Sequence, residues 1–306
     1  MTSYRKMRCR RNRPSDPDKS CTGPYGELFI YYLKGRLPAG GRSLPDGCIG
    51  NWEEENDTFL FFDRPAFQQV EILLSRQPQL SYIDSYQMTY EQWLGEVFSG
   101  FEYGKFQVMP PWEASPGICN PSRADSKSLS ILLDPGLVFG TGTHPTTRDC
   151  LDALEIAAGT KELTTVLDLG TGTGLLALAA AKLGSTGVVA ADLNFLAAQT
   201  AKLNVKLNHL QDRVIAVQGR AEDLIKCRAE LVIANIHYAV MRQLLGNSDF
   251  FAKKRFILSG LLRSEARDIA GMLANHKAKI IRQWTHDGIW HTFYGKIRSE
   301  DGSYII

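Results

Sequence analysis

The second half of the chain alternates short apolar runs with segments whose apolar residues recur at helical spacing. Short apolar runs are typical of buried strands, and apolar residues about three or four apart predict the inner face of a helix. We therefore expect strands at 164–169, 187–192, 213–218, 230–236 and 256–260. We expect helices at 148–157, 175–183, 195–208, 238–245 and 264–276. The alternation predicts an α/β domain with a mostly parallel sheet.

The end of the chain departs from this alternation. Two apolar runs, 279–284 and 290–296, are separated by a segment that contains Asp287-Gly288. Because Asp-Gly tolerates the positive φ angles of tight hairpin turns, we expect these runs to form an antiparallel hairpin. The mostly parallel sheet would then be closed by an antiparallel C-terminal hairpin.

The chain before residue 101 divides into three segments. Residues 1–25 form a basic tail that we expect to be disordered, and 26–86 form a small α+β domain with strands at 27–33 and 59–62 and a helix at 67–76. Residues 87–100 carry apolar side chains at helical spacing and predict a connecting helix. The α/β domain then occupies 101–306.

The most informative motif follows the first strand of the α/β alternation. The run Asp168-x-Gly-x-Gly-x-Gly places Gly170, Gly172 and Gly174 between this strand and a helix, and Asp192 ends the next strand. The glycines allow a tight turn and a close approach of the backbone to a ligand. Strand, glycine turn, helix, strand and terminal acid together predict a nucleoside site, with Asp192 accepting the ribose hydroxyls. The alternative is a glycine-rich turn that binds no ligand.

The glycine spacing indicates which nucleoside would bind. A nicotinamide or flavin site requires Gly-x-Gly-x-x-Gly, but position 175 is Leu, and the Gly-Lys-Ser/Thr of a phosphate-binding loop does not occur at this turn. The carboxylate of Asp168, before the first glycine, would repel a pyrophosphate and suits a cationic amino-acid group. These features favour S-adenosylmethionine, which carries an ammonium and a sulfonium.

The composition is that of a soluble enzyme. No apolar run of this 306-residue chain approaches the roughly 20 residues of a membrane span. The six cysteines lack any Cys-x-x-Cys pairing and the six histidines lack a His-Glu-x-x-His motif, so we expect reduced thiols and no metal site. This usage predicts a cytoplasmic protein that does not associate with membranes.

The net charge of +2 is unevenly distributed, because residues 1–13 hold six basic side chains and no acidic one. The tail is interpreted as a solvated extension, or as the result of a start codon placed too early, with Met7 as the alternative start. A second interpretation is an arm that makes weak contact with RNA. A mitochondrial transit peptide is a third, although Asp16 and Asp18 count against it.

A second motif lies before the nucleoside unit, in the run Ile131-Leu-Leu-Asp-Pro-Gly-Leu-Val-Phe-Gly-Thr-Gly-Thr-His-Pro-Thr-Thr147. Taken alone, it is compatible with an ordinary helix-capping loop. Together with the glycine turn, it resembles the PrmA family of class I S-adenosylmethionine-dependent methyltransferases, which methylate lysines of ribosomal protein L11. The resemblance covers nearly the whole chain after residue 25, through the stretches Tyr32-Leu-Lys-Gly-Arg36, Gly50-Asn-Trp-Glu-Glu54, Pro110-Pro-Trp112, Ala234-Asn-Ile236, Ser259-Gly-Leu-Leu262 and Gly288-Ile-Trp-His-Thr292.

The resemblance implies a fold and a set of cofactor contacts. The fold would be α/β, a class I (Rossmann-like) seven-stranded sheet with an antiparallel C-terminal hairpin, preceded by a small ferredoxin-like domain that recognises the substrate. The cofactor contacts would be Thr147, Gly170, Asp192 and Asn235, beside Asp168, Gly172 and Gly174 of the glycine motif. Glu222 would lie near the adenine or be a solvated acid. The partner would be ribosomal protein L11, and the enzyme would be a monomer.

The chemistry inferred from these features is a direct in-line transfer of the methyl group to a neutral lysine amine or α-amine. The site must position the amine, exclude water and accept a proton. Asn235 is the expected catalytic residue, since its side-chain carbonyl would hold the amine. The loop and substrate channel would use Phe139, Gly140, Thr141, His144 and Tyr238, with Trp112 as a further wall and His237 as a second candidate proton acceptor. Ordinary packing of the aromatic rings and structural roles for the histidines are the alternatives.

The run Ile236-His-Tyr-Ala239 departs from the Ile-Leu-Ala that is common in the family. This run follows Asn235, where the amine would enter, so the substrate is less certain than the chemistry. A PrmA-like methyltransferase of a different protein is therefore one alternative. A non-catalytic ribosome-associated factor that binds S-adenosylmethionine is another. A nucleic-acid methylase is less favoured, because Asn235 is not followed by Pro-Pro-Tyr.

Overall fold

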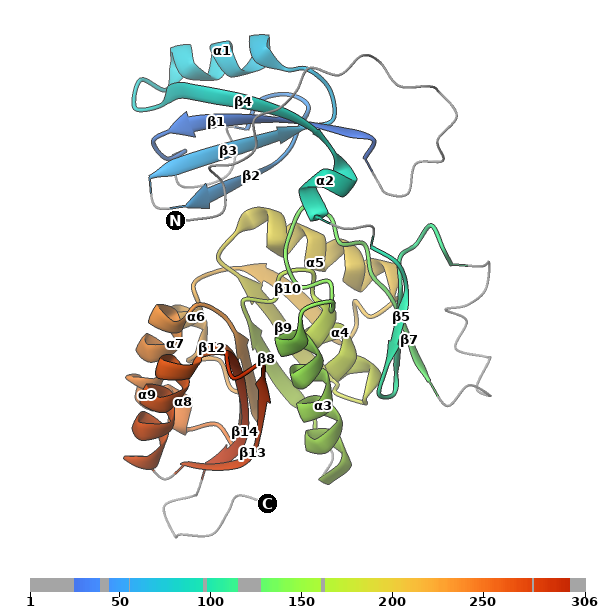
Figure 1. The fold of residues 1–306 in the computed structure, drawn as a ribbon, viewed down its shortest axis with the longest axis vertical. Helices are drawn as coiled ribbons and strands as arrows, with labels where there is room; N and C mark the ends of the chain where they lie inside the picture. The colour runs from blue at the N-terminus through green and yellow to red at the C-terminus, as the bar shows by residue number, and fades with distance from the viewer. Residues whose placement is uncertain are drawn as a thin grey trace. The chain divides into compact units, whose positions relative to one another are not determined.

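The computed structural model describes residues 25–38, 44–54, 56–95, 98–114, 128–160, 163–276 and 278–297. The chain divides into two compact units, 1–97 and 98–306 (Figure 1). The basic tail at 1–25, except for Tyr25, lies outside the described residues, so its predicted disorder and RNA contact stay predictions.

The N-terminal unit is an antiparallel sheet in the order β2-β3-β1-β4, with one helix on one of its faces (Figure 1). The elements are β1 Glu27–Lys34, β2 Cys48–Glu54, β3 Asp57–Phe62, α1 Phe67–Arg76 and β4 Ser81–Thr89. The alternation of β1 turns Tyr31 and Leu33 toward α1, where they meet Val70 and Leu73 in a buried cluster. Burial of this apolar stripe fixes the helix on the sheet.

The predicted helix at 87–100 is wrong for most of its length. Strand β4 continues to Thr89, and the helix that follows, α2 (Tyr90–Leu94), is short. Thr89 caps it by accepting the Gln92 N–H (3.2 Å), and Gly95 ends it in the left-handed conformation at φ 79°. The apolar spacing was that of a helix, but the capping box and the glycine limit it to one turn. Strand β4 was missed because it is largely exposed at the sheet edge and shows no apolar alternation.

The C-terminal unit contains a seven-stranded sheet in the order β10-β9-β8-β11-β12-β14-β13. Its strands are β8 Thr165–Leu169, β9 Gly187–Asp192, β10 Val214–Gln218, β11 Leu231–Asn235, β12 Arg255–Leu262, β13 Ala278–His286 and β14 Trp290–Ile297. The first five are parallel, and β14 runs antiparallel to both β12 and β13. The mostly parallel sheet and its terminal hairpin are therefore confirmed.

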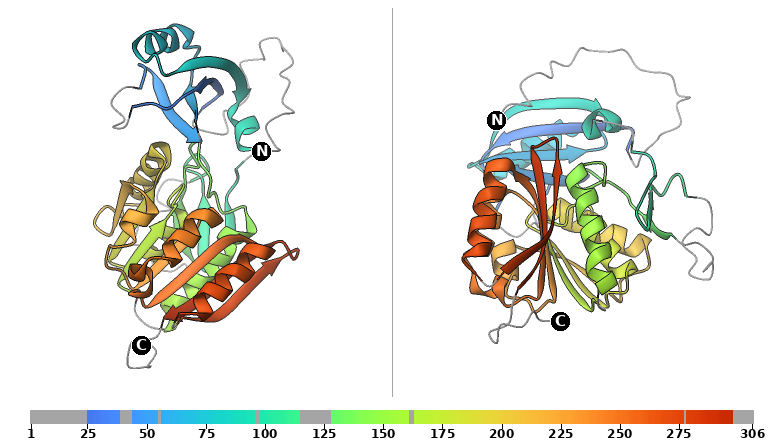
Figure 2. Two further views of the ribbon diagram at one scale, coloured as in Figure 1. Left: turned by 90° about the vertical axis from the view of Figure 1, so that its left-hand side faces the viewer. Right: turned by 60° about the horizontal axis from the view of Figure 1, so that its bottom comes forward.

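Helices cover both faces of this sheet (Figures 1 and 2). They are α3 Pro145–Thr160, α4 Leu175–Lys182, α5 Phe195–Leu207, α6 Ala221–Leu224, α7 Tyr238–Leu245, α8 Ser248–Phe251 and α9 Arg263–Ala274. One face packs on α3, α4 and α5, and the other on α6 to α9. Because β11 lies between the two layers, Val232, Ile233 and Ala234 are completely buried. This burial explains the continuous apolar run by which the strand was predicted.

The turn between β13 and β14 has the geometry that Asp-Gly predicts. Asp287 has a φ of 52° and Gly288 a φ of 66°, and the Ile289 N–H donates to the His286 carbonyl (2.9 Å). The positive φ angles allow the two strands to reverse direction over this short turn.

A third, smaller sheet precedes α3 and was not predicted. Its strands are β5 Phe101–Tyr103, β6 Phe106–Met109 and β7 Leu129–Leu132, with β6 antiparallel to β5 and parallel to β7. These strands are too short for a periodic pattern to identify them. Within the part of the chain that the structure describes, none of the helices is long and apolar enough to cross a bilayer.

The burial pattern of the helices predicts how two leucine truncations differ. Leu244 in α7 is fully buried in the core beside β11 and β12, whereas Leu203 in α5 is 59% exposed. We expect Leu244→Ala to lower the free energy of unfolding by about 3 kcal/mol. Leu203→Ala should change it by no more than about 0.5 kcal/mol. Urea unfolding of both variants, followed by circular dichroism, measures the difference, and equal losses would contradict this placement of the core.

Candidate functional site

The three glycines of the sequence motif form the turn between β8 and α4. All three have positive φ angles, 73° at Gly170, 54° at Gly172 and 87° at Gly174. A Cβ at Gly170 would collide with the Ile236 side chain, and one at Gly172 with the Phe139 carbonyl oxygen. Both the backbone angles and the close contacts therefore require glycine. The predicted glycine turn and its helix are confirmed as structural elements.

Asp192, at the end of β9, lies beside this turn. Its Oδ2 accepts the Gly172 N–H (3.0 Å) and its Oδ1 accepts the Asn194 N–H (2.9 Å). Burial raises the pKa of Asp192, while the two backbone donors oppose that rise. A carboxylate has about four acceptor positions, so this one keeps capacity for further donors such as hydroxyls.

Asp168 is more deeply buried, with 1% of its surface exposed. Thr171 donates its hydroxyl to Asp168 Oδ2 (2.5 Å). Burial raises the pKa of Asp168 to about 7; the Thr171 bond opposes the rise and the nearby Asp192 charge adds to it. Such a carboxyl group changes its charge near neutral pH and would respond to a cation placed beside it.

The second motif docks onto the glycine turn through its backbone. The Thr173 N–H donates to the Phe139 carbonyl (3.1 Å), and the Thr173 hydroxyl donates to the Gly140 carbonyl (2.6 Å). Gly140 and Gly142, with φ angles of 100° and 93°, let this loop turn past the motif. The structure therefore brings together two motifs that are about thirty residues apart in the chain.

Two asparagines, Asn204 of α5 and its C-cap residue Asn208, hold the second motif in place; sequence reasoning missed both. Asn204 is completely buried; it donates to the carbonyls of Asp134 and Thr173 and accepts the Asp134 N–H, each at 2.8 Å. Asn208 accepts the Leu132 N–H (2.9 Å) and donates to the Leu132 carbonyl (2.6 Å). The two amides thus satisfy loop backbone groups as a neighbouring strand would. Their spacing of one helical turn on an otherwise apolar helix face was the available signal.

Asn235, at the end of β11, lies against the start of α3. Its Nδ2 is 3.5 Å from Thr146 Oγ1, and both Thr146 and Thr147 are buried. Gly260 of β12, at a φ of 80°, leaves space for the amide, because a Cβ there would be 2.9 Å from Asn235 Oδ1. Gly260 is a further site residue that sequence reasoning missed.

His144 and Thr141 belong to the exposed part of the second motif. His144 Nδ1 is 2.7 Å from Thr146 Oγ1, and its ring packs edge-on against Trp290 at 5.1 Å. Although much of His144 is exposed, its partial burial lowers its pKa; nearby Asp149 opposes that effect and His286 adds to it. Thr141 pairs with Thr143 through their hydroxyls (2.9 Å). Thr141 and His144 therefore both make contacts within the loop, and His144 also contacts Trp290 of β14.

The side chains of three predicted residues have no described contact with this group, although the Phe139 carbonyl accepts the Thr173 N–H. Glu222 lies in α6, after the end of β10, where it pairs with Arg220 (3.1 Å). The Tyr238 hydroxyl donates to Asp268 of α9 (2.7 Å). Phe139 is 71% exposed. Adenine contact by Glu222 and channel roles for Phe139 and Tyr238 stay predictions.

His237 acts as the N-cap of α7, with its Nδ1 accepting the Ala239 N–H (3.4 Å). This is the structural role that was the alternative to proton transfer. Trp112 is partly buried in the segment after β6.

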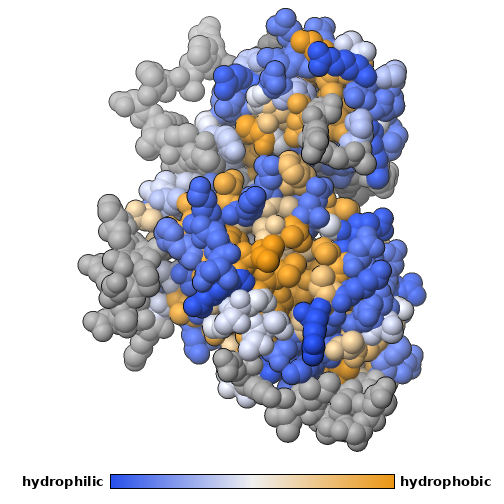
Figure 3. Space-filling model, turned by 180° about the vertical axis from the view of Figure 1, so that it is seen from behind, coloured by the Kyte–Doolittle hydropathy of each residue, from blue (hydrophilic) through white to orange (hydrophobic). Residues whose placement is uncertain are grey.

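The surface near Asp192 is apolar. Leu193, the next residue, is 67% exposed. Together with Phe139 of the second motif, it gives two large apolar side chains that face solvent. Figure 3 shows an apolar area in the middle of the C-terminal unit, surrounded by hydrophilic side chains. Exposed apolar area of this kind is typical of ligand and protein contact sites.

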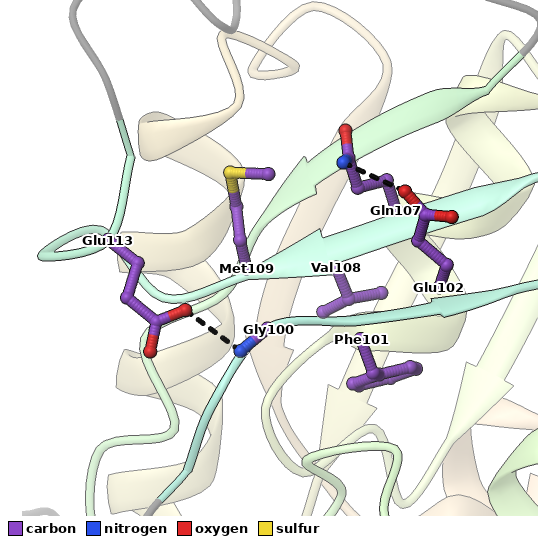
Figure 4. Close-up of a pocket in the computed structure, with 7 residues that line it drawn as sticks. All are labelled: Gly100, Phe101, Glu102, Gln107, Val108, Met109 and Glu113. Carbon is purple, nitrogen blue, oxygen red and sulfur yellow. Dashed lines mark hydrogen bonds between the residues drawn. The ribbon is translucent and has the colours of Figure 1, made fainter.

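A pocket of about 270 Å³ lies on the small sheet. Phe101, Val108 and Met109 line it, and the Gly100 N–H donates to Glu113 Oε2 across it (3.0 Å, Figure 4). Its lining contains none of the predicted site residues, so it is not a candidate for the nucleoside site. Among the described residues, no group of three or more His, Cys, Asp or Glu side chains is placed to hold a metal ion.

Comparison with known proteins identifies relatives of known name. Residues 68–298 match the family described as ribosomal protein L11 methyltransferase (PrmA). A protein of that name from Geobacillus kaustophilus is 41% identical over 175 residues, which are 56% of this chain and 53% of the relative. One from Desulfitobacterium hafniense is 36% identical over 185 residues, 60% of this chain and 56% of the relative. The chain thus spans about half the length of the curated relatives that it matches.

A solved structure supports the same assignment. The ribosomal protein L11 methylase from Lactobacillus delbrueckii subsp. bulgaricus is 27% identical and superposes with a TM-score of 0.54, covering 66% of this chain and all of that one. The seven-stranded sheet of the C-terminal unit is accordingly the class I methyltransferase fold. The family match covers about three quarters of the sequence. The chain belongs to the ribosomal protein L11 methyltransferase (PrmA) family.

Proposed function

We propose that this protein transfers a methyl group from S-adenosylmethionine to an amine of a protein, with ribosomal protein L11 as the substrate. The observation that carries the proposal is the position of Asp192 and Asn235. They end β9 and β11, the two strands that flank β8, beside the glycine turn. In a parallel sheet the carboxyl ends of neighbouring strands form a common edge, and ligands bind there.

The residues at this edge fit S-adenosylmethionine. Asp192 would accept the ribose hydroxyls, since both of its oxygens retain lone pairs beyond the bonds to Gly172 and Asn194. The glycine turn provides room for close approach of a ligand to the backbone. Asp168 would counter the positive charge of the amino-acid end. Thr147, at the start of α3, and Glu222 remain further candidate contacts.

The cofactor supplies a methyl group on a sulfonium, which a neutral amine displaces in line. The protein must then place the amine, keep water out and favour the loss of its proton. The Asn235 carbonyl would accept a hydrogen bond from the amine and fix its direction of approach. A lysine amine has a pKa of about 10.4 in water, so an apolar entrance that lowers this pKa would increase the fraction of the amine that is neutral.

The N-terminal unit is proposed to recognise the substrate as a ferredoxin-like domain. Its strand order and antiparallel pairing, with α1 between β3 and β4, support this assignment. A complete ferredoxin-like domain has a second helix after its first strand, and none is described between β1 and β2. Contact of the basic tail with RNA, a monomeric state and a cytoplasmic location complete the proposal.

Two alternative functions are compatible with the same site. The run of residues after Asn235 differs from the run that is common in the family. Two of its residues have local structural roles, since His237 caps α7 and Tyr238 is hydrogen-bonded to α9. A different protein substrate is therefore compatible with the same chemistry. A ribosome-associated factor that binds the cofactor without turnover is the second alternative.

Two substitutions should separate cofactor binding from catalysis. Asp192→Ala removes the ribose acceptor and should raise the dissociation constant of S-adenosylmethionine at least about tenfold, which is the loss of roughly one good charged hydrogen bond. Asn235→Ala should lower the turnover number more than it weakens binding. Calorimetry with S-adenosylmethionine and tritium transfer to purified ribosomal protein L11 measure the two effects.

A whole-cell lysate, assayed in parallel, tests the substrate. Label in the purified ribosomal protein supports the proposal, and label only in another protein would support the first alternative. Cofactor binding with no methyl transfer to any protein would support the second. Full activity in both variants would show that the site lies elsewhere.

The pKa of Asp168 predicts how cofactor affinity depends on pH. A cation beside Asp168 stabilises its ionised form, so binding must remove the proton that this carboxyl carries below about pH 7. The affinity for S-adenosylmethionine should therefore be fully present above that pH and fall as the pH drops through it. In Asp168→Asn, which cannot ionise, this part of the dependence should disappear. Parallel pH curves for the two proteins, measured by calorimetry, would contradict the assignment.

A further inference from the structure

Thr146 lies between Asn235 and His144 and contacts both. Its Oγ1 is 2.7 Å from His144 Nδ1 and 3.5 Å from Asn235 Nδ2. Its own backbone N–H points to the same His144 Nδ1, at 3.4 Å. The side chain is 3% exposed, so these are the groups that set the direction of its hydroxyl.

The hydroxyl has one proton, and the contacts decide where that proton goes. The Thr146 N–H points to His144 Nδ1, and this contact favours the tautomer in which that nitrogen carries a lone pair. The Thr146 hydroxyl then donates to the same nitrogen, and its oxygen is left as an acceptor for the Asn235 amide N–H. The three residues form a directed chain from Asn235 Nδ2 through Thr146 Oγ1 to His144 Nδ1.

This chain determines which end of the Asn235 amide is available to a substrate. With Nδ2 turned to Thr146, Oδ1 lies over Gly260, where a Cβ would come within 2.9 Å. We propose that Thr146 is a positioning residue that presents the Asn235 carbonyl to the incoming amine, and that His144 fixes the direction of the Thr146 hydroxyl. This inference rests on the proposed methyl transfer, which makes Asn235 the residue that meets the amine.

The backbone of Thr146 is held as firmly as its side chain. Ser259 Oγ of β12 donates to the Thr146 carbonyl (3.2 Å) and lies 2.6 Å from Thr292 Oγ1 of β14. Thr292 in turn donates to Asp149 Oδ2 (2.9 Å), and His286 of β13 pairs with Asp149 Oδ1 (2.7 Å). The start of α3 is thereby tied to the C-terminal hairpin. These bonds hold the Thr146 backbone in place, so the direction of its hydroxyl is set relative to the Asn235 amide.

The surroundings of His144 make this arrangement depend on pH. The charged or titratable groups that act on it are Asp149 of α3 and His286 of β13, while Trp290 of β14 packs on it as a neutral ring. Arg148 is turned away, with its Nε donating to the Gly142 carbonyl (3.3 Å). Burial lowers the pKa of His144, so it is neutral at neutral pH.

Protonation of His144 would reverse the chain. Nδ1 would become a donor to Thr146 Oγ1, so the hydroxyl proton would lose its acceptor. The Asn235 amide could supply a new one by flipping, so that its carbonyl accepts from Thr146. In that state Oδ1 is no longer available to the substrate amine. Methyl transfer should therefore be present above the pKa of His144 and lost below it.

Matched threonine substitutions test the positioning role. Thr146→Val keeps the side-chain shape and removes the hydroxyl, and we expect the single-turnover rate constant to fall by roughly 10- to 100-fold, as misplacement of a reacting group does. Thr146→Ser keeps the hydroxyl and should retain most of the rate. Thr165→Val is the matched control, because Thr165 Oγ1 accepts a backbone N–H from Glu230 (3.0 Å) at the opposite end of β8. Its rate should equal that of the unmodified protein.

The pH dependence tests the role of His144. Loss of the lysine proton makes the logarithm of the rate rise with a slope of one per pH unit, on the order of tenfold. Below the pKa of His144 a second proton is involved, and the slope should steepen to about two. His144→Asn provides an acceptor oxygen that does not titrate, so its slope should stay near one over the whole range. A slope of one in the unmodified protein would overturn this part of the inference.

A readout that does not need methyl transfer separates the inference from the proposed function. Nitrogen-15 NMR of the ligand-free protein should show His144 protonated at Nε2 and not at Nδ1. It should also show an Asn235 side-chain amide resonance that shifts in Thr146→Val and not in Thr165→Val. Protonation at Nδ1, or an unchanged amide resonance, would overturn the inference whether or not the protein is active. Absence of methyl transfer together with the expected NMR result would overturn only the proposed function.

Discussion

The candidate site of this protein depends on one close approach of two backbone segments. The carbonyl of Phe139 lies where a side chain at Gly172 would be, and the neighbouring Thr173 binds both this carbonyl and that of Gly140. The second motif can therefore reach the glycine turn only because the turn has no Cβ at that position. This contact places the start of α3, with Thr146 and Thr147, beside the end of β11. The positions of the other polar groups of the site depend on this contact.

Hydrogen bonds from buried amides and hydroxyls stabilise that contact. Asn204 and Asn208 satisfy the backbone of the second motif from α5, and Ser259 with Thr292 hold the start of α3 from the other side. Each of these groups would cost free energy if it were buried without a partner, so the packed state favours a single arrangement. This arrangement requires buried polar residues that the helix and strand patterns alone do not predict. Their removal would loosen the site without removing any group that meets the ligands.

Electrostatics at this edge are set by burial more than by charge pairing. Asp168 and Asp192 both have raised pKa values because they are removed from water, and the bonds from Thr171, Gly172 and Asn194 offset part of the effect. His144 shifts in the opposite direction for the same reason, since burial disfavours the charged form of any group. A cationic ligand beside the two carboxylates would supply the charge that the protein leaves uncompensated. Asp168, with a pKa of about 7, changes protonation near neutral pH, where an enzyme can use such a group.

The sequence alone determined the elements of the sheet and the local geometry of the glycine turn. The strands from Thr165 to Asn235, the helix at Tyr238–Leu245 and the Asp287-Gly288 turn follow from periodicity and φ preferences, which depend only on residues close in the chain. Tertiary structure decided the extent of β4, the partners of Tyr238 and Glu222, and the roles of Asn204, Thr146 and Gly260. These depend on contacts between segments distant in the sequence, for which a single chain carries no periodic signal. The motif residues of the candidate site, such as Asp192 and Asn235, could be picked out from the sequence, whereas Asn204, Gly260 and the contacts around Asn235 required the fold.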